Sequence, residues 1–176
     1  MKVSILGAGD ISKISRYTSM QETALNKLID DIAQLLVDKK AEMVIIPNRG
    51  IPLDIAKRYK EKGGKKVLGV IPIQDKDYGL GHIKEFLPIV DERIDVDSWY
   101  DADGKVAAFG DICITVGMSP GVIRALTALK FHYKYKKSKT KLIIFKNTIS
   151  KKLHKEIEEE MPIVYIENVE ELKKLI

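Results

Sequence analysis

The stretch of sequence that decides the fold is Gly110-Asp111-Ile112-Cys113-Ile114-Thr115-Val116-Gly117-Met118-Ser119-Pro120-Gly121. Residues 112–116 are apolar and largely β-branched, which is typical of a buried strand. Pro120 suits the first turn of a helix, and an apolar pattern continues from there to Tyr135. A strand, a glycine turn and a helix in this order predict one βα unit of a parallel sheet.

The same order of strand, turn and helix repeats on both sides of this stretch. Ile5-Leu6-Gly7-Ala8-Gly9-Asp10 ends a first strand, and Asn48-Arg49-Gly50-Ile51-Pro52 follows a second one. The expected strands are 2–6, 43–47, 67–72, 112–116, 142–145 and 163–166, with a short strand and turn within 86–93. The expected helices are 19–39, 52–62, 120–135, 150–160 (with Ser150 as N-cap) and 168–175. We therefore predict one α/β domain over residues 1–176, a Rossmann-like three-layer fold with a central parallel sheet flanked by helices.

Composition narrows the class of protein. The chain has 176 residues, with 30 Lys and Arg against 25 Asp and Glu. Its single cysteine, Cys113, lies in an apolar run, which favours a buried thiol in a reducing compartment. We see no basic leader and no long apolar segment, so we expect a cytoplasmic protein without a membrane span. Abundant Lys, Glu and Ile with few Gln favour a thermophilic source.

Much of the positive charge is concentrated in Lys130–Lys141, where aromatic side chains alternate with lysines. Basic and aromatic residues together are one signature of single-stranded nucleic-acid binding. The interpretation we favour is a solvated helix end, because lysines suit the negative end of the helix dipole. Nucleic acid therefore stays a secondary expectation as a partner.

The three glycine turns predict a ligand site, because the turns after parallel strands meet at one edge of the sheet. Glycine lets the backbone approach a ligand, and the start of the following helix favours an anion such as phosphate. The candidate binding residues are Gly7, Ala8, Gly9, Asp10, Asn48, Arg49, Gly50, Gly117, Met118, Ser119, Gly121 and Val122. Ser12 stands where a dinucleotide fingerprint has its third glycine, which counts against an NAD dehydrogenase. Ordinary βα turns without a ligand are the alternative.

These turns, together with Gly63-Gly64-Lys65-Lys66-Val67-Leu68-Gly69-Val70-Ile71-Pro72, resemble the LOG family, once called lysine decarboxylase-like, within the SLOG superfamily. The resemblance covers roughly residues 1–147 and implies a Rossmann-like fold, a nucleotide-type ligand and a homodimer. The superfamily includes cytokinin-activating phosphoribohydrolases, molybdenum-cofactor carrier proteins and DNA-processing protein A. The catalytic residues of the phosphoribohydrolases are missing: Ala125 matches the family glutamate, Val122 the threonine, and the family arginine falls near Ala102. Arg124, beside the glutamate position, cannot replace a carboxylate.

The resemblance therefore implies a protein that binds a nucleotide or a nucleotide-derived phosphate, without the standard phosphoribohydrolase activity. We expect no cofactor beyond such a bound nucleotide. One alternative is an N-glycosidase acting on nucleoside monophosphates, with His82, Asp75 or Asp77 as acid or base. Another is a single-stranded nucleic-acid module resembling DNA-processing protein A.

The remaining candidate groups are interpreted more simply. The three histidines lack metal-ligand spacing, so we expect no metal site. The acidic run from Asp91 to Asp103 around Trp99 is interpreted as a solvated loop. Trp99 and Tyr100 either stack on a base or pack in the core or in a dimer face.

Overall fold

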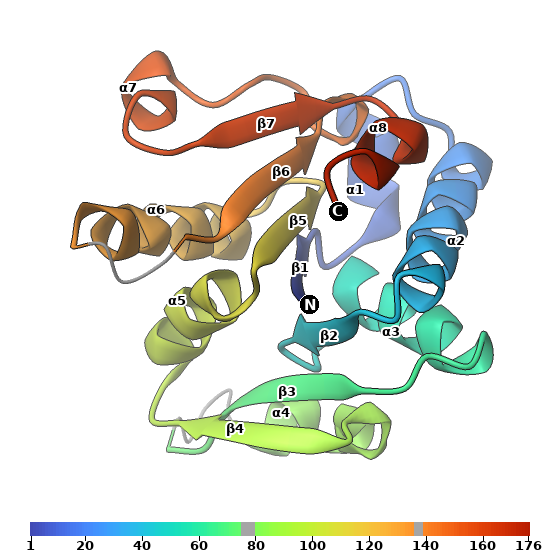
Figure 1. Ribbon diagram of the computed structural model, residues 1–176, viewed down its shortest axis with the longest axis vertical. Coiled ribbons are helices and arrows are strands. Elements are labelled where there is room, and N and C mark those ends of the chain that lie inside the picture. The colour runs from blue at the N-terminus through green and yellow to red at the C-terminus, as the bar shows by residue number, and fades with distance from the viewer. Residues whose placement is uncertain (75–79, 136–138) are drawn as a thin grey trace.

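The computed structural model describes residues 1–74, 80–135 and 139–176, and its centre is one parallel sheet (Figure 1). The sheet has seven strands in the order β4-β3-β2-β1-β5-β6-β7. The strands are β1 (Lys2–Gly7), β2 (Glu42–Ile45), β3 (Val67–Pro72), β4 (Glu92–Val96), β5 (Ile112–Val116), β6 (Lys141–Phe145) and β7 (Ile163–Ile166). Strands β2, β3 and β4 follow one another on one side of β1, and β5, β6 and β7 follow one another on its other side. The strand order thus reverses between β1 and β5, which is where open α/β sheets bind ligands.

Helices cover both faces of the sheet. They are α1 (Ile11–Tyr17), α2 (Glu22–Asp38), α3 (Ile51–Glu61), α4 (Leu80–Ile83), α5 (Trp99–Phe109), α6 (Pro120–Lys134), α7 (Lys155–Glu158) and α8 (Val169–Lys173), with 3-10 turns η1 (Lys84–Ile89) and η2 (Lys146–Thr148). Helices α2, α3 and α8 pack on one face, and α5 and α6 lie together on the other (Figure 1). Three layers result, as expected from the sequence.

Strand residues alternate between the two cores because successive side chains point to opposite faces of a sheet. In β5, Ile112 and Ile114 face the core under α2 and α3, whereas Cys113 between them faces α5 and α6. All five residues of β5 are buried, as are all six of β3. This double burial explains why the sequence shows continuous apolar runs rather than polar alternation.

The predicted strands and most predicted helices are confirmed, with differences in four places. The strand expected within 86–93 lies instead at Glu92–Val96, after the η1 turn. The helix expected at 19–39 begins at Glu22, and a separate short helix, α1, precedes it. The helix expected at 150–160 is reduced to Lys155–Glu158, and Ser150 does not cap it. The backbone before it is extended, and the N–H of Leu153 donates to the hydroxyl of Tyr165 at 3.1 Å.

The fourth difference is helix α5, which occupies a segment that we interpreted as a solvated acidic loop. Ser98 caps this helix by accepting the N–H of Asp101, and the Asp101 carboxylate accepts the N–H of Ser98 at 3.1 Å. This reciprocal capping box accounts for the start of the helix. Asp101 is the acidic residue of the first turn, where a carboxylate is favoured near the positive end of the helix dipole.

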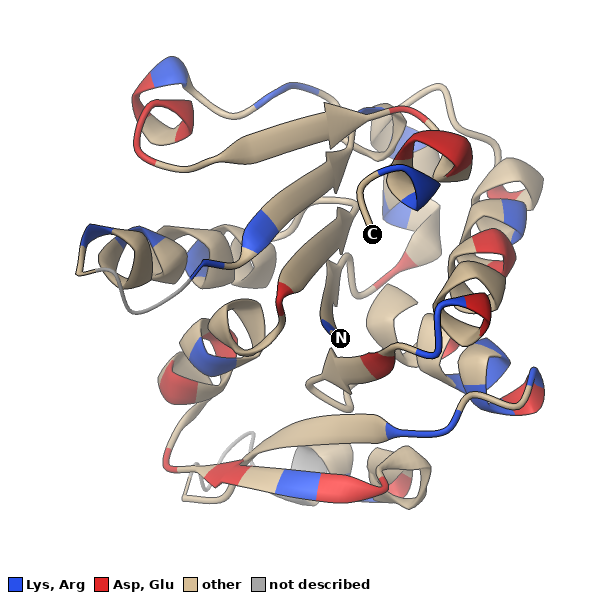
Figure 2. Cartoon of the chain, viewed as in Figure 1, with Lys and Arg blue, Asp and Glu red and all other residues tan. Residues whose placement is uncertain are grey.

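Charged side chains are spread over the helices and the outer strand β4, while the inner strands carry few of them (Figure 2). Within the basic stretch, Lys130 forms an ion pair with Glu160, which neutralises part of the charge. Phe131 and Tyr135 are exposed at the end of α6. Among the residues described, no helix is long and apolar enough to cross a membrane.

Candidate functional site

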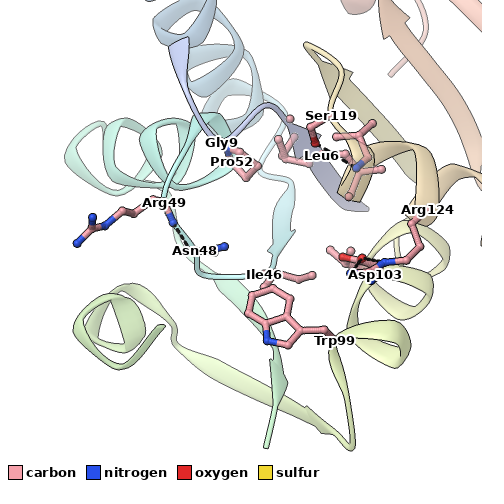
Figure 3. Close-up of a pocket in the computed structure, with 15 residues that line it drawn as sticks. Leu6, Gly9, Ile46, Asn48, Arg49, Pro52, Trp99, Asp103, Ser119 and Arg124 are labelled. Carbon is pink, nitrogen blue, oxygen red and sulfur yellow. Dashed lines mark hydrogen bonds and ion pairs between the residues drawn. The ribbon is translucent and has the colours of Figure 1, made fainter. Parts of the chain in front are cut away.

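A cavity of about 210 Å³ opens at the carboxyl edge of the sheet, beside the point where the strand order reverses (Figure 3). It lies between the ends of β1 and β2, the starts of α3 and α6, and one face of α5. Its lining residues are Ile5, Leu6, Gly7, Gly9, Ile46, Asn48, Arg49, Pro52, Trp99, Asp103, Val106, Ser119, Gly121, Val122 and Arg124. The three glycine turns therefore do meet at one place, as the parallel topology requires.

The turns are held together by backbone hydrogen bonds. The N–H of Ala8 donates to the carbonyl of Val116, and the carbonyl of Ala8 accepts the N–H of Ile51, both at 3.1 Å. Gly50 has a φ of +117°, and a Cβ there would lie 2.6 Å from the Ala8 carbonyl oxygen. Only glycine fits this conformation without strain, because L side chains rarely adopt it. The first turn is thus fixed against both the second and the third.

The cavity brings together some of the sequence-predicted binding residues and leaves others aside. Those that line it are Gly7, Gly9, Asn48, Arg49, Ser119, Gly121 and Val122. Those outside its lining are Ala8, Asp10, Gly50, Gly117 and Met118. Gly117 has a φ of +78° and its N–H donates to the Thr148 hydroxyl at 2.8 Å, so it shapes the turn rather than facing the cavity.

The start of α6 presents polar donors to the cavity. Ser119 is the N-cap, and its hydroxyl oxygen accepts the N–H of Val122 at 3.3 Å. The Val122 N–H is therefore occupied, while the N–H of Gly121 has no partner among the described residues. The serine hydroxyl keeps its own proton to donate. Two donors at the positive end of a 15-residue helix remain for a ligand.

The first turn differs, because its own carboxylate occupies the start of α1. Asp10 accepts the N–H of Ser12 at 2.9 Å. Hydrogen bonding from Ser12 lowers the pKa of the Asp10 carboxyl, so that it stays ionised. A negative charge there disfavours a phosphate. The first turn consequently offers the close backbone of Gly7 and Gly9 instead of an anion site.

Arg49 does not direct its guanidinium into the cavity. Its side chain points away from the other lining residues (Figure 3), and its Nη2 donates to the Glu85 carboxylate at 2.9 Å. The guanidinium also lies 5.9 Å from the centre of the Phe86 ring. Both members of this ion pair are more than half exposed, and such pairs stabilise by only about 0–1 kcal/mol. An anionic ligand can therefore compete with Glu85 for Arg49.

Sequence reasoning offered Trp99 as a base-stacking residue but missed helix α5 and, with it, Asp103 and Val106. Trp99, Asp103 and Val106 line it from one face of this helix, at helical spacing. The Asp103 side chain is 10% exposed and forms an ion pair with Arg124 of α6. Burial raises the pKa of the Asp103 carboxyl, and the hydrogen bond and charge of Arg124 act against this rise. The capping box Ser98–Asp101 is the sequence signal that would have revealed this helix.

The weaker catalytic candidates are not brought to this site by anything the structure describes. Asp75 and Asp77 lie outside the described residues. His82 lies within α4, and its side chain also falls outside the description. In residues 1–74, 80–135 and 139–176, no group of three His, Cys, Asp or Glu side chains is arranged to hold a metal ion.

Comparison with solved structures identifies proteins of the same fold. The chain is 15% identical to a structural-genomics protein designated TM1055, with a TM-score of 0.69 over 99% of this chain and 96% of that one. It is 14% identical to the molybdenum cofactor carrier protein of Chlamydomonas reinhardtii, with a TM-score of 0.65 over 99% and 94%. It is 15% identical to DNA processing protein A of Helicobacter pylori, described for its binding of single-stranded DNA, with a TM-score of 0.62 over 99% and 79%. No family model and no curated protein sequence matches the chain. At these identities the likeness establishes a shared Rossmann-like fold.

Proposed function

We propose that this protein binds a nucleotide or a nucleotide-derived phosphate ligand in the cavity at the carboxyl edge of the sheet. The observation that carries the proposal is that one cavity joins a wall suited to a planar ring with a group of donors suited to a phosphate. Trp99, Ile46 and Val106 form the wall, and Ser119 and Gly121 provide the donors. Apolar walls with a few converging polar groups are typical of small-molecule sites.

The size of the cavity limits the ligand. Its volume of about 210 Å³ is below the roughly 300–1,000 Å³ of pockets that enclose drug-sized molecules. It is suited to one ring and part of a sugar, with the phosphate reaching the rim at the start of α6. We therefore infer a mononucleotide or a ligand of similar size rather than a dinucleotide.

The fold likeness supports the same class of function. The structural neighbour from Chlamydomonas reinhardtii is named for carrying the molybdenum cofactor. We propose on this basis, and on the motifs of residues 1–147, that the chain is a LOG-like member of the SLOG group that binds its ligand. Pairing into a homodimer and a cytoplasmic location go with that proposal, and light scattering of the purified protein measures the first.

One observation favours a second candidate, cleavage of an N-glycosidic bond. Such cleavage passes through an oxocarbenium-like state that a carboxylate stabilises, and the cavity contains the carboxylate of Asp103. This residue lies next to Ala102, and Arg124 lies next to Ala125, the positions where the family has its arginine and glutamate. Release of free base from nucleoside monophosphates, followed by chromatography, tests this candidate.

The experiment that tests the binding proposal begins with the protein as purified. It is denatured gently and the released small molecules are identified by mass spectrometry. Calorimetry with mononucleotides then measures affinity, and single-stranded DNA is titrated in parallel at several salt concentrations. A mononucleotide that binds with a Kd below about 1 mM supports the proposal. Binding of the DNA alone, weakening steeply with salt, contradicts it and favours the nucleic-acid alternative.

A further inference from the structure

We propose that Asp103 makes this site selective for a 2-amino-4-oxopyrimidine ring, as found in guanine nucleotides and in pterin phosphates. The inference rests on the proposed function, because it concerns the ring of the ligand that the cavity binds. It adds a specificity-determining residue and a ring chemistry to that function.

An aromatic wall and a carboxylate lie on the same face of one helix. Trp99 and Asp103 are four residues apart in α5, and both line the cavity. Side chains at this spacing are neighbours on a helix surface. A ring that packs against the indole of Trp99 therefore presents one of its edges to the Asp103 carboxylate. Ile46, at the end of β2, lies on the cavity wall near Trp99 (Figure 3).

Asp103 keeps unused hydrogen-bonding capacity. Nε of Arg124 donates to Oδ2 of Asp103 at 2.5 Å, and Nη2 of Arg124 contacts the same oxygen. The other oxygen, Oδ1, has no hydrogen-bond partner among the described residues. An ionised carboxylate only accepts hydrogen bonds, and about four lone-pair sites are available to it. Nε and Nη2 of Arg124 use both lone pairs of Oδ2, so the two N–H donors of a ligand ring converge on Oδ1.

The edges of the common rings differ in the hydrogen-bonding groups that they present. Guanine and pterin carry a ring N–H and an adjacent amino group, so they present two donors side by side. Hypoxanthine keeps the ring N–H and lacks the amino group. Adenine places the acceptor N1 where guanine has a donor, and xanthine places a carbonyl oxygen where guanine has its amino group. A buried carboxylate repels such acceptors, because an unpaired buried polar group is costly.

Arg124 positions Asp103 rather than contacting the ring. Its guanidinium lies 4.7 Å from the centre of the Tyr100 ring, so two side chains of α5, Tyr100 and Asp103, fix the arginine of α6. Its positive charge favours the ionised form of the carboxylate, the form that accepts both donors of the ligand. The Asp103–Arg124 pair thus supplies a fixed acceptor at the end of an apolar wall.

The test is calorimetry of the full-length protein with five probes: the 5′-monophosphates of guanosine, inosine, xanthosine and adenosine, and neopterin phosphate. We expect the guanosine compound to bind about 10- to 100-fold more tightly than the adenosine compound, the range that a hydrogen bond to a charged, buried acceptor supplies. Inosine monophosphate is expected between them. Tight binding of neopterin phosphate together with weak binding of guanosine monophosphate identifies the pterin as the source of the ring.

The variant that tests Asp103 is Asp103→Asn, because an amide presents a donor where the carboxylate has an acceptor. We expect it to lose affinity for guanosine monophosphate and to gain affinity for xanthosine monophosphate, so that the preference between these two reverses. The matched control is Asp38→Asn, the same change at an exposed position of α2 outside the cavity lining. The control is expected to keep the ranking of the wild-type protein.

Several outcomes overturn the inference, and they differ from failure of the proposed function. Equal binding of guanosine and adenosine monophosphates by the wild-type protein overturns it, whether or not the variant folds. An Asp103→Asn variant that keeps the wild-type ranking of the probes also overturns it. The same holds for a variant that no longer releases free base but still binds the same bases, because Asp103 then acts in cleavage and not in selectivity. Absence of binding by all five probes overturns the proposed function as well.

Discussion

Arg124 directs both Nε and Nη2 of its guanidinium to a single oxygen, Oδ2, of Asp103. This ion pair, which uses one oxygen of the carboxylate, joins α6 to α5 at the wall of the cavity. Asp103 thereby places a carboxylate in a wall that is otherwise formed by Trp99 and Val106. The Asp103 side chain is 10% exposed and that of Arg124 is 41% exposed. The charge of Asp103 is therefore partly desolvated, and its stability depends on the cation beside it.

Removing that cation gives the first prediction. Arg124→Ala is expected to lower the free energy of unfolding by about 1–2 kcal/mol at pH 7. The effect is no larger because solvent screens the partly exposed arginine. Burial already raises the pKa of Asp103, and without Arg124 that pKa rises further. A carboxyl with a raised pKa in the folded state contributes stability that is present below its unfolded pKa and lost as the pH rises through its folded value. The deficit of the variant should therefore shrink toward pH 4.

Urea denaturation of both proteins across this pH range measures the effect. Asp103→Asn and the Asp103→Asn, Arg124→Ala double variant complete a double-mutant cycle. A stability difference that stays constant from pH 4 to pH 7 would contradict the account of the pair.

The second prediction concerns the contact between the first two turns. Gly50→Ala places a Cβ 2.6 Å from the Ala8 carbonyl oxygen at a φ of +117°. Gly63 also has a positive φ, of +86°, but no heavy atom lies within 4 Å of the position of its Cβ. Gly63→Ala should cost about 1 kcal/mol from backbone strain alone. Gly50→Ala should cost clearly more and weaken ligand binding, and thermal melts with calorimetry distinguish the two. Equal destabilisation by both substitutions would show that the turns are not locked together.

The third prediction separates helix capping from ligand binding. Ser119→Ala removes the N-cap of α6, and Asn168→Ala removes the N-cap of α8, where Asn168 accepts the N–H of Glu171 at 3.0 Å. Each loss of a cap should cost about 1 kcal/mol of stability. Only Ser119→Ala should also reduce ligand affinity, because Asn168 is not among the residues that line the cavity. If both variants bind the ligand as tightly as the wild-type protein, Ser119 is a cap and nothing more.

The fourth prediction uses the single cysteine of the chain. Cys113 is fully buried in β5, and burial raises the pKa of its thiol to about 12. Because the thiolate is the reactive form, labelling with a disulfide reagent at pH 8 should be negligible in the native protein. It should become complete when denaturant unfolds the chain. Rapid labelling without denaturant would contradict the burial of β5.

The parallel sheet could be predicted from the sequence because its strands are buried on both faces. The runs 67–72 and 112–116 are continuous and apolar, and each is followed by a glycine or a polar turn. The meeting of the turns after β1, β2 and β5 follows from that topology alone. Which residues of those turns face the cavity could not be predicted. Positive φ angles and close backbone contacts commit Gly50 and Gly117 to shaping the turns.

The α5 side of the cavity was not predicted, because the acidic sequence at the start of this helix was interpreted as a loop. The acidic residues around Trp99 suggested a solvated loop, while Ser98 and Asp101 form a capping box that begins a helix. Once this segment is helical, Trp99, Asp103 and Val106 fall on one face and line the cavity. The pairing of Asp103 with Arg124 depends on how α5 packs on α6, a tertiary contact that spacing along the chain does not reveal.

The most direct measurement is the fluorescence of Trp99, the single tryptophan of the chain and a residue of the cavity lining. Its emission is followed while guanosine monophosphate is added, with adenosine monophosphate as the comparison. The account predicts a saturable change with a Kd below about 1 mM for the guanosine compound, and a weaker response to the adenosine compound. Emission that stays unchanged with both compounds, in a protein shown to be folded, would contradict the claim that this cavity holds a nucleotide-type ring.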